Sequence, residues 1–203
     1  MKYSNLNLGQ IEALVNNIGG MDAVERILAG KATVKVALIH KLMKAKTFPV
    51  YLEIEVGGKS KDELFTKFEV NNMVATRSDY DIMSQDAWKP GKKEIIRFAR
   101  VRVRDLGFTE KPTIADIWAR IKQLGHSLCE PCDGPAIRLA LKDPSERGVC
   151  LIAMKQITDS HGSPYVFELG SFRSKCQLYS HWLASGVEWD LDSTNELVFR
   201  LGK

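Results

Sequence analysis

Residues 129–167 read CEPCDGPAIRLALKDPSERGVCLIAMKQITDSHGSPYVF, and this stretch carries most of the information about the fold. Short apolar runs alternate in it with turn residues, among them a Gly-Pro pair and a Ser-His-Gly segment. Strands separated by turns at such short intervals are typical of antiparallel sheets. The stretch therefore predicts strands at residues 137–141 and 149–154 and a third strand at residues 165–169.

The segments on either side extend this pattern. Downstream, apolar or alternating runs predict further strands at residues 176–182, 187–189 and 197–201. Upstream, Thr113 and Asp116 have the spacing of a capping box, and apolar residues then recur at helical spacing as far as Gly125. We therefore predict an antiparallel β-meander at the C-terminus, preceded by a helix.

The middle of the chain mixes both kinds of pattern. Alternating segments predict strands at residues 50–56 and 95–103. Ser60 and Glu63 have the spacing of a second capping box, which opens the first of two predicted helices. The second of these helices covers residues 78–85. This part of the chain is therefore predicted to be mixed α/β.

The N-terminal residues predict a helical hairpin. Apolar residues recur at helical spacing over residues 8–18 and again over residues 21–28, and a Gly-Gly pair separates the two runs. Residues 32–43 fit either a strand or a helix. We place a domain boundary after them: residues 1–47 form the helical hairpin and connector, and residues 48–203 form an α+β domain that ends in an antiparallel sheet. The predicted fold class of the chain is α+β.

The composition is that of an ordinary globular protein. Of the 203 residues, 44% are hydrophobic and 27% are charged, and the formal net charge is +4. No apolar run reaches the roughly 18 residues of a membrane span, and the N-terminus lacks the apolar core of a signal peptide. We therefore expect a cytoplasmic protein without a membrane partner. Glycine-rich phosphate loops and common zinc-ligand spacings are missing from the sequence, so we expect no cofactor and no metal.

Several motifs along the chain resemble one family. The run LGF at residues 106–108, TIADIWARIKQLG at 113–125, LIAM at 151–154 and ITDS at 157–160 occur in its order and spacing. This pattern resembles a family of hypothetical proteins from genomes of candidate-phylum, Parcubacteria-type bacteria. The similarity covers most of the chain and is weakest at residues 44–56 and 86–104. Because the family has no assigned activity, the resemblance carries over no catalytic residue, cofactor or substrate.

Cys129 and Cys132 form a CxxC pair, which is compatible with a redox site or with half of a zinc site. A structural zinc site needs two further ligands, and Cys150 and Cys176 stand alone in the sequence. The pair follows a predicted helix and precedes a Gly-Pro turn, whereas a reactive thiol of this kind lies at the start of a helix. Members of the family carry an acidic residue at the position of Cys132. We therefore favour plain reduced thiols.

Asp159, Ser160 and His161 are the residue types of a hydrolase triad. Members of a triad converge from separate segments, however, and three consecutive residues in a turn cannot face one another in that way. We therefore interpret these residues as a turn in which Gly162 takes a positive φ.

Basic side chains gather between residues 89 and 104, and six of them are candidate nucleic-acid-binding residues: Lys92, Lys93, Arg97, Arg100, Arg102 and Arg104. In a strand, alternation would place Arg100, Arg102 and Arg104 on the face that carries Phe98. A row of guanidinium groups of this kind matches a phosphate backbone. The alternative is the solvated face of a sheet, with the arginines paired to acids on a neighbouring strand.

Three hypotheses about function follow from these patterns. The leading one is a non-enzymatic binding or interaction protein, because no motif supplies a nucleophile, a base or a set of metal ligands. The second is a nucleic-acid-binding accessory protein that uses the basic strand; the N-terminal hairpin resembles a helix-turn-helix only loosely. The third is an enzyme whose site is assembled only in the fold, with candidates Cys129, Asp159, His181 and Asp190. The expected partner is thus an unknown protein or a nucleic acid.

Overall fold

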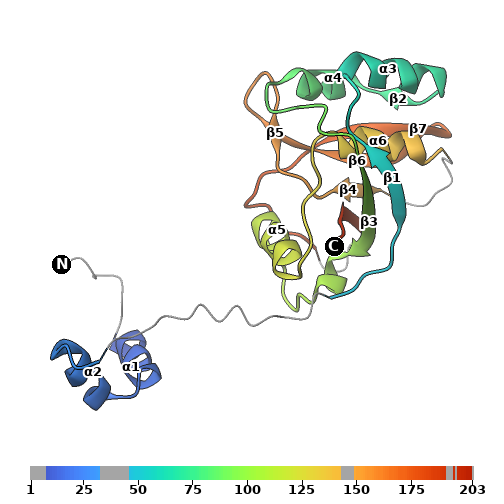
Figure 1. Ribbon diagram of the computed structural model, residues 1–203. Coiled ribbons are helices and arrows are strands. Elements are labelled where there is room, and N and C mark those ends of the chain that lie inside the picture. The colour runs from blue at the N-terminus through green and yellow to red at the C-terminus, as the bar shows by residue number, and fades with distance from the viewer. Residues whose placement is uncertain (1–7, 33–45, 143–148, 191–193, 195, 203) are drawn as a thin grey trace. The chain divides into compact units, whose positions relative to one another are not determined.

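Figure 1 shows the computed structural model of the protein, which describes residues 8–32, 46–142, 149–190, 194 and 196–202. The chain forms two compact units, Met1–Leu42 and Met43–Lys203. None of the helices in the described ranges has the length and the apolar character that crossing a bilayer requires.

The first unit contains, within its described residues, the helices α1 (Leu8–Asn17) and α2 (Met21–Leu28). Gly19 and Gly20 lie between them with φ angles of 107° and 82°, which glycine adopts without strain. No residue of α2, all of which is described, is buried, and Leu28 is 82% exposed. Residues 33–43, where the sequence fits both a strand and a helix, lie outside the described part of the chain.

The second unit is built on one mixed sheet. The described residues contribute eight strands: β1 (Leu52–Val56), β2 (Val74–Ala75), β3 (Glu94–Arg102), β4 (Cys150–Ile152), β5 (Ile157–Thr158), β6 (Pro164–Phe172), β7 (Lys175–Trp182) and β8 (Glu196–Arg200). Their order is β1-β3-β8-β4-β6-β7-β2, and β5 pairs with β6. The pairs β4–β8 and β2–β7 are parallel, and the other pairs are antiparallel. This half-barrel sheet and its helices confirm the α+β class.

The C-terminal strands depart from a simple meander. Strands β6 and β7 are antiparallel neighbours in chain order, as predicted, and the short strand β5, which was not predicted, precedes them and pairs with β6. Strand β8 instead inserts between β3 and β4, where Leu197 pairs with Val101 on one side and with Leu151 on the other. Its three central residues are completely buried, which suits an inner strand. The strand predicted at residues 187–189 is wrong, because this described segment makes only an isolated bridge to Thr113.

Four α-helices and one 3₁₀ helix complete the described part of this unit: α3 (Lys61–Val70), α4 (Arg77–Ser84), η1 (Val103–Leu106), α5 (Ile114–Gln123) and α6 (Asp133–Ala140). The capping boxes predicted at Ser60 and Thr113 are confirmed, since each hydroxyl accepts a hydrogen bond from the backbone N–H three residues on. Thr76 caps α4 in the same way. These caps satisfy N–H groups that have no partner inside a helix, so they determine where the helices begin.

Helix α6 replaces the strand predicted at residues 137–141. Gly134 and Pro135 lie in its first turn, where a proline costs no helical hydrogen bond. The apolar alternation that suggested a strand is short, and a short run does not separate a helix from a strand. Gly134 also allows close packing, because a Cβ there would lie 2.8 Å from the ring of Phe167. The start of α6 therefore rests directly on β6.

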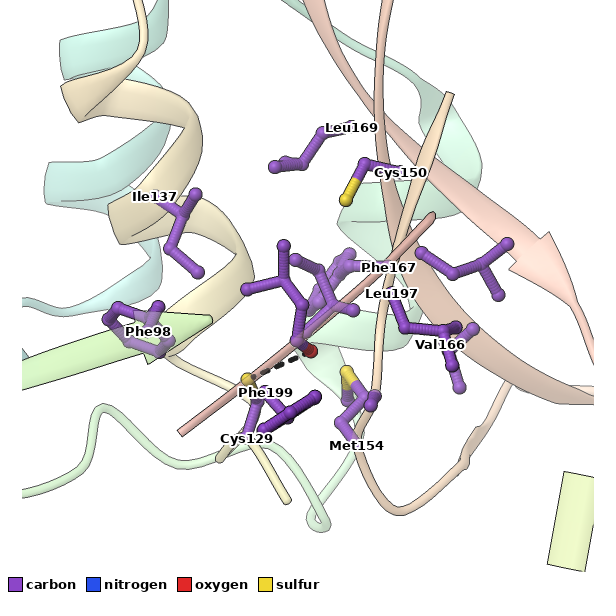
Figure 2. Close-up of a cluster of buried hydrophobic side chains, with 14 of the residues drawn as sticks. Phe98, Cys129, Ile137, Cys150, Met154, Val166, Phe167, Leu169, Leu197 and Phe199 are labelled. Atoms are coloured by element: carbon purple, nitrogen blue, oxygen red, sulfur yellow. Dashed lines mark hydrogen bonds between the residues drawn. The ribbon is translucent and has the colours of Figure 1, made fainter. Parts of the chain in front are cut away.

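The main hydrophobic core lies where α6 crosses the sheet. Figure 2 shows Ile137 of α6 facing a cluster that includes Phe98 of β3 and Phe167 of β6. All three side chains are completely buried. Helix α6 contacts β1, which lies at one end of the strand order, and β6 and β7, which lie near the other end, so it links the two sides of the sheet.

Candidate metal-binding pocket

A pocket of about 520 Å3 opens between helix α4 and the turn that joins β5 to β6. Helix α4 contributes Arg77, Ser78, Tyr80, Asp81, Ile82 and Ser84 to its walls, and the turn and β6 contribute Asp159, Ser160, His161 and Tyr165. Its volume lies in the range of pockets that bind small molecules. Charged, hydroxyl and aromatic side chains line it together, which makes it the candidate functional site.

The turn side of the pocket is shaped by Asp159. Its Oδ1 accepts hydrogen bonds from the backbone N–H of His161 at 2.9 Å and of Ser163 at 2.8 Å. Gly162 has a φ of 83°, so the turn predicted from the sequence is confirmed at this residue. Since Oδ1 takes both N–H groups, Oδ2 of Asp159 is left for the pocket.

The α4 side is anchored to the sheet by Asp79. Its carboxylate accepts hydrogen bonds from the backbone and hydroxyl of Thr76, which caps the helix, and from the hydroxyl of Ser180 on β7. Burial raises the pKa of Asp79, and the hydrogen bonds from Ser180 and Thr76 oppose that shift. One turn of the helix therefore lies at a fixed place on the sheet, and the next residues face the β5–β6 turn.

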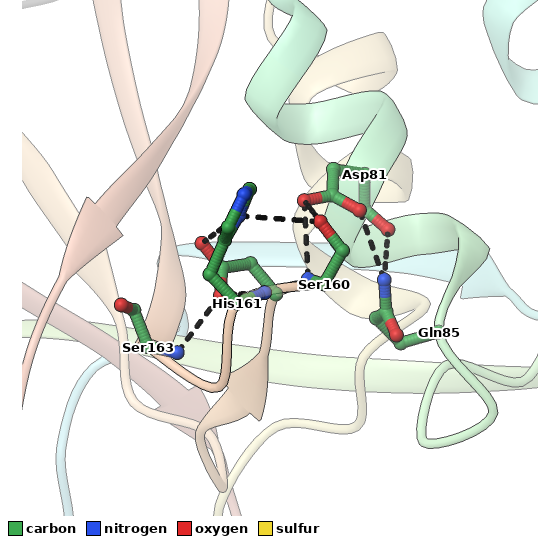
Figure 3. A network of polar contacts seen from close by, with 6 residues as sticks. Asp81, Gln85, Ser160, His161 and Ser163 are labelled. Atoms are coloured by element: carbon green, nitrogen blue, oxygen red, sulfur yellow. Dashed lines mark hydrogen bonds and ion pairs between the residues drawn. The ribbon is translucent and has the colours of Figure 1, made fainter.

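Asp81 joins the two sides of the pocket. Ser160 donates to Asp81 Oδ2 through its backbone N–H at 3.2 Å and through its hydroxyl at 2.9 Å. Gln85 Nε2 donates to the other oxygen, Oδ1, at 2.9 Å. Figure 3 shows Ser160 between His161 and Asp81, with its hydroxyl and its N–H directed at the carboxylate. These bonds hold the Asp81 carboxylate at the pocket wall.

Three side chains converge here with atoms that can bind a metal. One ligand atom from each of Asp81, Asp159 and His161 lies within 4.8 Å of the others. Within this set, His161 Nδ1 is 3.8 Å from Asp159 Oδ2. In the described part of the chain this is the one group of three or more such side chains that meets this spacing.

The pocket also lowers the pKa of one of its acids. Hydrogen bonds from the backbone and the hydroxyl of Ser160 lower the pKa of Asp81, and slight desolvation opposes them. A metal ligand has to be deprotonated, so this shift favours the form of Asp81 that binds a cation.

The geometry does not form a hydrolase triad. Ser160 Oγ lies 3.3 Å from His161 Nδ1, and Asp159 Oδ2 lies 3.8 Å from the same nitrogen. A triad needs the nucleophile at one ring nitrogen and the acid at the other. The three consecutive residues thus form the turn expected from the sequence. Asp81 of helix α4 supplies the third candidate metal ligand beside Asp159 and His161.

His181, a candidate for an enzyme site, is not brought to this pocket. Its Nδ1 lies 2.7 Å from Glu168 Oε2, on strands β7 and β6. Its neighbour Trp182 is paired with Tyr165, which lines the pocket, and successive side chains of a strand point to opposite faces. His181 and Glu168 therefore form a separate ion pair on the other face of the sheet.

Two further enzyme candidates, Asp190 and Cys129, are not among the residues that line the pocket. Asp190 is exposed, and its carboxylate lies 4.0 Å from Lys111 Nζ. Cys129 is buried, and its thiol donates to the carbonyl of Val198 at 3.6 Å. Of the four candidates only Asp159 belongs to the pocket, so the four do not make one site.

All four cysteines fall in the described ranges, and all are reduced and buried. Cys132 is the N-cap residue of α6, so the prediction that the CxxC pair precedes a Gly-Pro turn is wrong. Burial nevertheless raises the pKa of Cys132 and of Cys150 to about 12. A protonated thiol is neither a nucleophile nor a metal ligand, so the environment of these residues favours plain thiols.

A second pocket, of about 590 Å3, lies beside the CxxC loop. Lys122 and Lys155 bring cations to it, Glu130 brings an acid, and Cys129 lines it. The thiol of Cys129 is turned to the carbonyl of Val198. This pocket therefore offers no group of metal-binding atoms, unlike the pocket at α4.

The basic residues between 92 and 104 are divided between two faces of β3. Arg97 pairs with Glu53 of β1, whereas Arg100 and Arg102 alternate to the opposite face, the one that carries Phe98. Strand β3 ends at Arg102, and Arg104 belongs to the 3₁₀ helix η1. The expected row of three arginines along one strand is therefore interrupted.

Several of these basic side chains also have acidic partners. Lys92 and Lys93 precede β3, and Lys93 Nζ lies 3.1 Å from Glu55 Oε2. Arg100 Nε donates to Glu196 Oε2 on β8 at 2.6 Å. Pairing of this kind reduces the positive field of the strand, which favours the paired sheet face over a phosphate-binding row.

Asp81 is the functional candidate that the sequence does not identify. It lies in a helix that the sequence predicts, and its acidic neighbour two positions away, Asp79, does not share its side of the helix. Its contact with Ser160 spans 79 residues. An Asp on the polar side of a helix is common, so no local signal separates this one from the others.

The chain was compared with models of protein families, with curated proteins and with solved structures. None of the three comparisons finds a match. No residue of the pocket therefore takes a role from another protein, and its chemistry follows from its own geometry.

Proposed function

We propose that the protein binds a divalent transition-metal ion, such as Mn2+ or Zn2+, through Asp81, Asp159 and His161. The observation that carries the proposal is that these three residues place ligand atoms within 4.8 Å of one another in the wall of a pocket. Binding of this kind belongs to the class of non-enzymatic binding functions. It replaces the expectation of no metal, which rested on the spacing of residues along the chain.

The donor set determines the kind of ion. Two carboxylates and one imidazole suit Zn2+ and Mn2+, whereas Ca2+ and Mg2+ prefer ligand sets made of oxygen alone. Three protein ligands leave at least one coordination position open for water or another molecule. The pocket offers the space for that molecule.

Hydrogen bonds orient the two carboxylate ligands. Asp159 uses Oδ1 for two backbone N–H groups, and Asp81 is held by Ser160 and Gln85. Contacts of this type orient metal ligands in known sites. Two ligands that are each about 2.1 Å from one ion lie at most about 4.2 Å apart, so the cluster has to close slightly. The side chain of His161 is 84% exposed and has room to turn inward.

The experiment is a calorimetric titration of the protein with Mn2+ and with Zn2+. Asp159→Asn is the sharpest variant, because its amide oxygen can still accept the two N–H groups of the turn while the anionic Oδ2 is lost. His161→Ala removes the imidazole from an exposed position. We expect each variant to bind Mn2+ at least about tenfold more weakly. His181→Ala is the control, since it removes a histidine on the other face of the sheet.

The stability of the metal-free variants distinguishes a binding role from a purely structural one. His161→Ala should unfold at the same denaturant concentration as the wild type, because an exposed side chain contributes little. Added Mn2+ should raise the stability of the wild type and not that of Asp159→Asn, because an ion that binds only the folded chain stabilises it. Titrations without heat for the wild type, or equal affinities for all variants, would reject the proposal and leave these residues a role in tying the turn to α4.

A further inference from the structure

We infer that the metal-loaded pocket binds a small phosphomonoester, with the phosphate at the ion and at Arg77 and the organic group against Tyr80 and Tyr165. The inference rests on the proposed function, since it requires the ion at Asp81, Asp159 and His161. It names the class of molecule that the open coordination position and the rest of the pocket would take.

The charge of the pocket selects an anion. Among the lining residues, Asp81 and Asp159 carry two negative charges and Arg77 carries one positive charge. A bound divalent ion changes this net negative charge into a net positive one. Lys61 adds a second cation at the edge of the pocket, because its Nζ donates at 2.9 Å to the hydroxyl of Ser84, which lines the wall. The loaded pocket thus carries a net positive charge and attracts a negatively charged ligand.

The chemistry of Arg77 favours a phosphate ligand over a carboxylate ligand. The guanidinium group of Arg77 presents a planar pair of donors that matches two phosphate oxygens. A phosphate can give one oxygen to an ion and still offer two to such a pair, whereas a carboxylate has only two oxygens in total. The hydroxyl of Ser78, the next residue in the wall, adds another neutral donor beside Arg77.

The rest of the pocket provides room and surface for an organic group. Its volume of about 520 Å3 lies in the range of pockets that enclose molecules much larger than a free phosphate ion. Tyr80 is 40% exposed, and its ring is stacked parallel to that of Phe65, with 8° between the planes. Tyr165 lines the other wall from β6. A flat or apolar group between these walls would bury aromatic surface that is now open to water.

The experiment starts from protein that has been saturated with Mn2+ and uses two probes, inorganic phosphate and phenyl phosphate, in separate calorimetric titrations. We expect both to bind and phenyl phosphate to bind more tightly, while acetate at the same concentration binds at least about tenfold more weakly. Arg77→Gln should weaken phosphate binding by about tenfold and leave Mn2+ binding within about twofold of the wild type. Arg102→Gln, an exposed arginine on β3, is the matched control.

The outcomes separate this inference from the proposed function. Binding of Mn2+ without binding of phosphate, or equal phosphate binding by Arg77→Gln and the wild type, overturns the inference and leaves the metal site standing. Phosphate that binds as tightly as phenyl phosphate overturns the placement of an organic group at the tyrosines. Failure of the wild type to bind Mn2+ in the first titration removes the proposed function, and the inference with it.

Discussion

Arg200 and Asp133 form a bidentate ion pair that joins strand β8 to the first turn of helix α6. Arg200 Nε donates to Asp133 Oδ2 at 2.6 Å, and Nη2 donates to Oδ1 at 2.8 Å. Asp133 is completely buried, and the side chain of Arg200 is only 14% exposed. Arg200 Nη1 also donates to Glu94 Oε1 at 2.9 Å. Buried paired charges depend on each other, so the loss of Asp133 would leave Arg200 with this more exposed partner alone.

Asp133→Asn is expected to lower the free energy of unfolding by about 3 kcal/mol, because it leaves the guanidinium of Arg200 facing a neutral amide. The asparagine can keep the hydrogen bond that Oδ2 accepts from the backbone N–H of Glu130 at 2.8 Å. Its NH2 group cannot accept the bond from Arg200 Nη2, so the loss reports the charge together with that bond. Urea unfolding measures it. Addition of Arg200→Met should recover part of the loss in a double-mutant cycle. A change below about 1 kcal/mol for Asp133→Asn would contradict the importance of this pair.

Gly134→Ala tests the contact between α6 and β6. A Cβ at this position would lie 2.9 Å from the Cβ of Phe167, so something has to shift. We expect a loss of about 1–3 kcal/mol in the free energy of unfolding, the usual cost of overfilling a packed core. Gly186→Ala is the control, because a Cβ there meets no atom within 4 Å and the change should stay within about 0.5 kcal/mol. Equal effects of the two changes would mean that α6 can move away from the sheet.

Arg100→Gln and Arg102→Gln decide between the two interpretations of the basic strand. Arg100 donates to Glu196 at 2.6 Å and to the hydroxyl of Tyr51 at 3.1 Å, so its loss should cost about 1–2 kcal/mol of stability. Arg102 is exposed, and its change should be nearly neutral. Fluorescence anisotropy with labelled DNA and RNA at low salt should show no dependence on either residue. Binding that weakens with salt and disappears in Arg102→Gln would restore the nucleic-acid hypothesis.

The cysteines should be unreactive in the folded protein. Burial raises the pKa of Cys132 and of Cys150 to about 12 from the ordinary value of 9, which lowers the thiolate fraction by about a thousandfold. A thiol reagent at slightly alkaline pH should therefore modify none of the four quickly until urea unfolds the chain. Fast modification of Cys132 in the native state would reopen a redox role for the CxxC pair.

Stability should respond to pH through His181. Its hydrogen bond to Glu168 raises its pKa above the ordinary value of 6.5, and desolvation opposes only part of the shift. Because folding favours the protonated imidazole, this stabilisation is fully present below pH 6.5 and is lost as the pH rises through the raised pKa. The side chain is 44% exposed, so we expect a loss of less than about 1 kcal/mol.

Glu168→Gln provides the check on this pH dependence. The substitution removes the carboxylate whose hydrogen bond and charge raise the pKa of His181, so an NMR titration should show that pKa falling, and the stability step above pH 6.5 should flatten. A step that persists in Glu168→Gln must come from another group.

Much of the secondary structure could be predicted because its causes are local. The capping boxes at Ser60 and Thr113 depend on residues only three positions apart, and both form as expected. Strand β3 is found at Glu94–Arg102, one residue from the prediction, because its alternation is long enough to separate a strand from a helix. Helix α6 was missed because its apolar run is short and its packing on β6 depends on a glycine opposite Phe167.

The candidate site could be predicted only in part. The sequence alone determined the turn at residues 159–162, since the aspartate and the glycine specify its hydrogen bonds and its positive φ. That turn placed Asp159 and His161 near each other. It could not show that they face a pocket, because one wall of the pocket belongs to helix α4.

Tertiary structure alone decided the rest. Asp81 meets Ser160 across 79 residues of chain, and Arg200 meets Asp133 across 67. Contacts at such separations depend on how helices and strands pack together, and that packing comes from non-directional burial of apolar surface across the whole unit. The sequence by itself therefore determined where most elements begin and end. Only the folded chain determined which polar residues meet, and with them the metal-binding pocket that we propose.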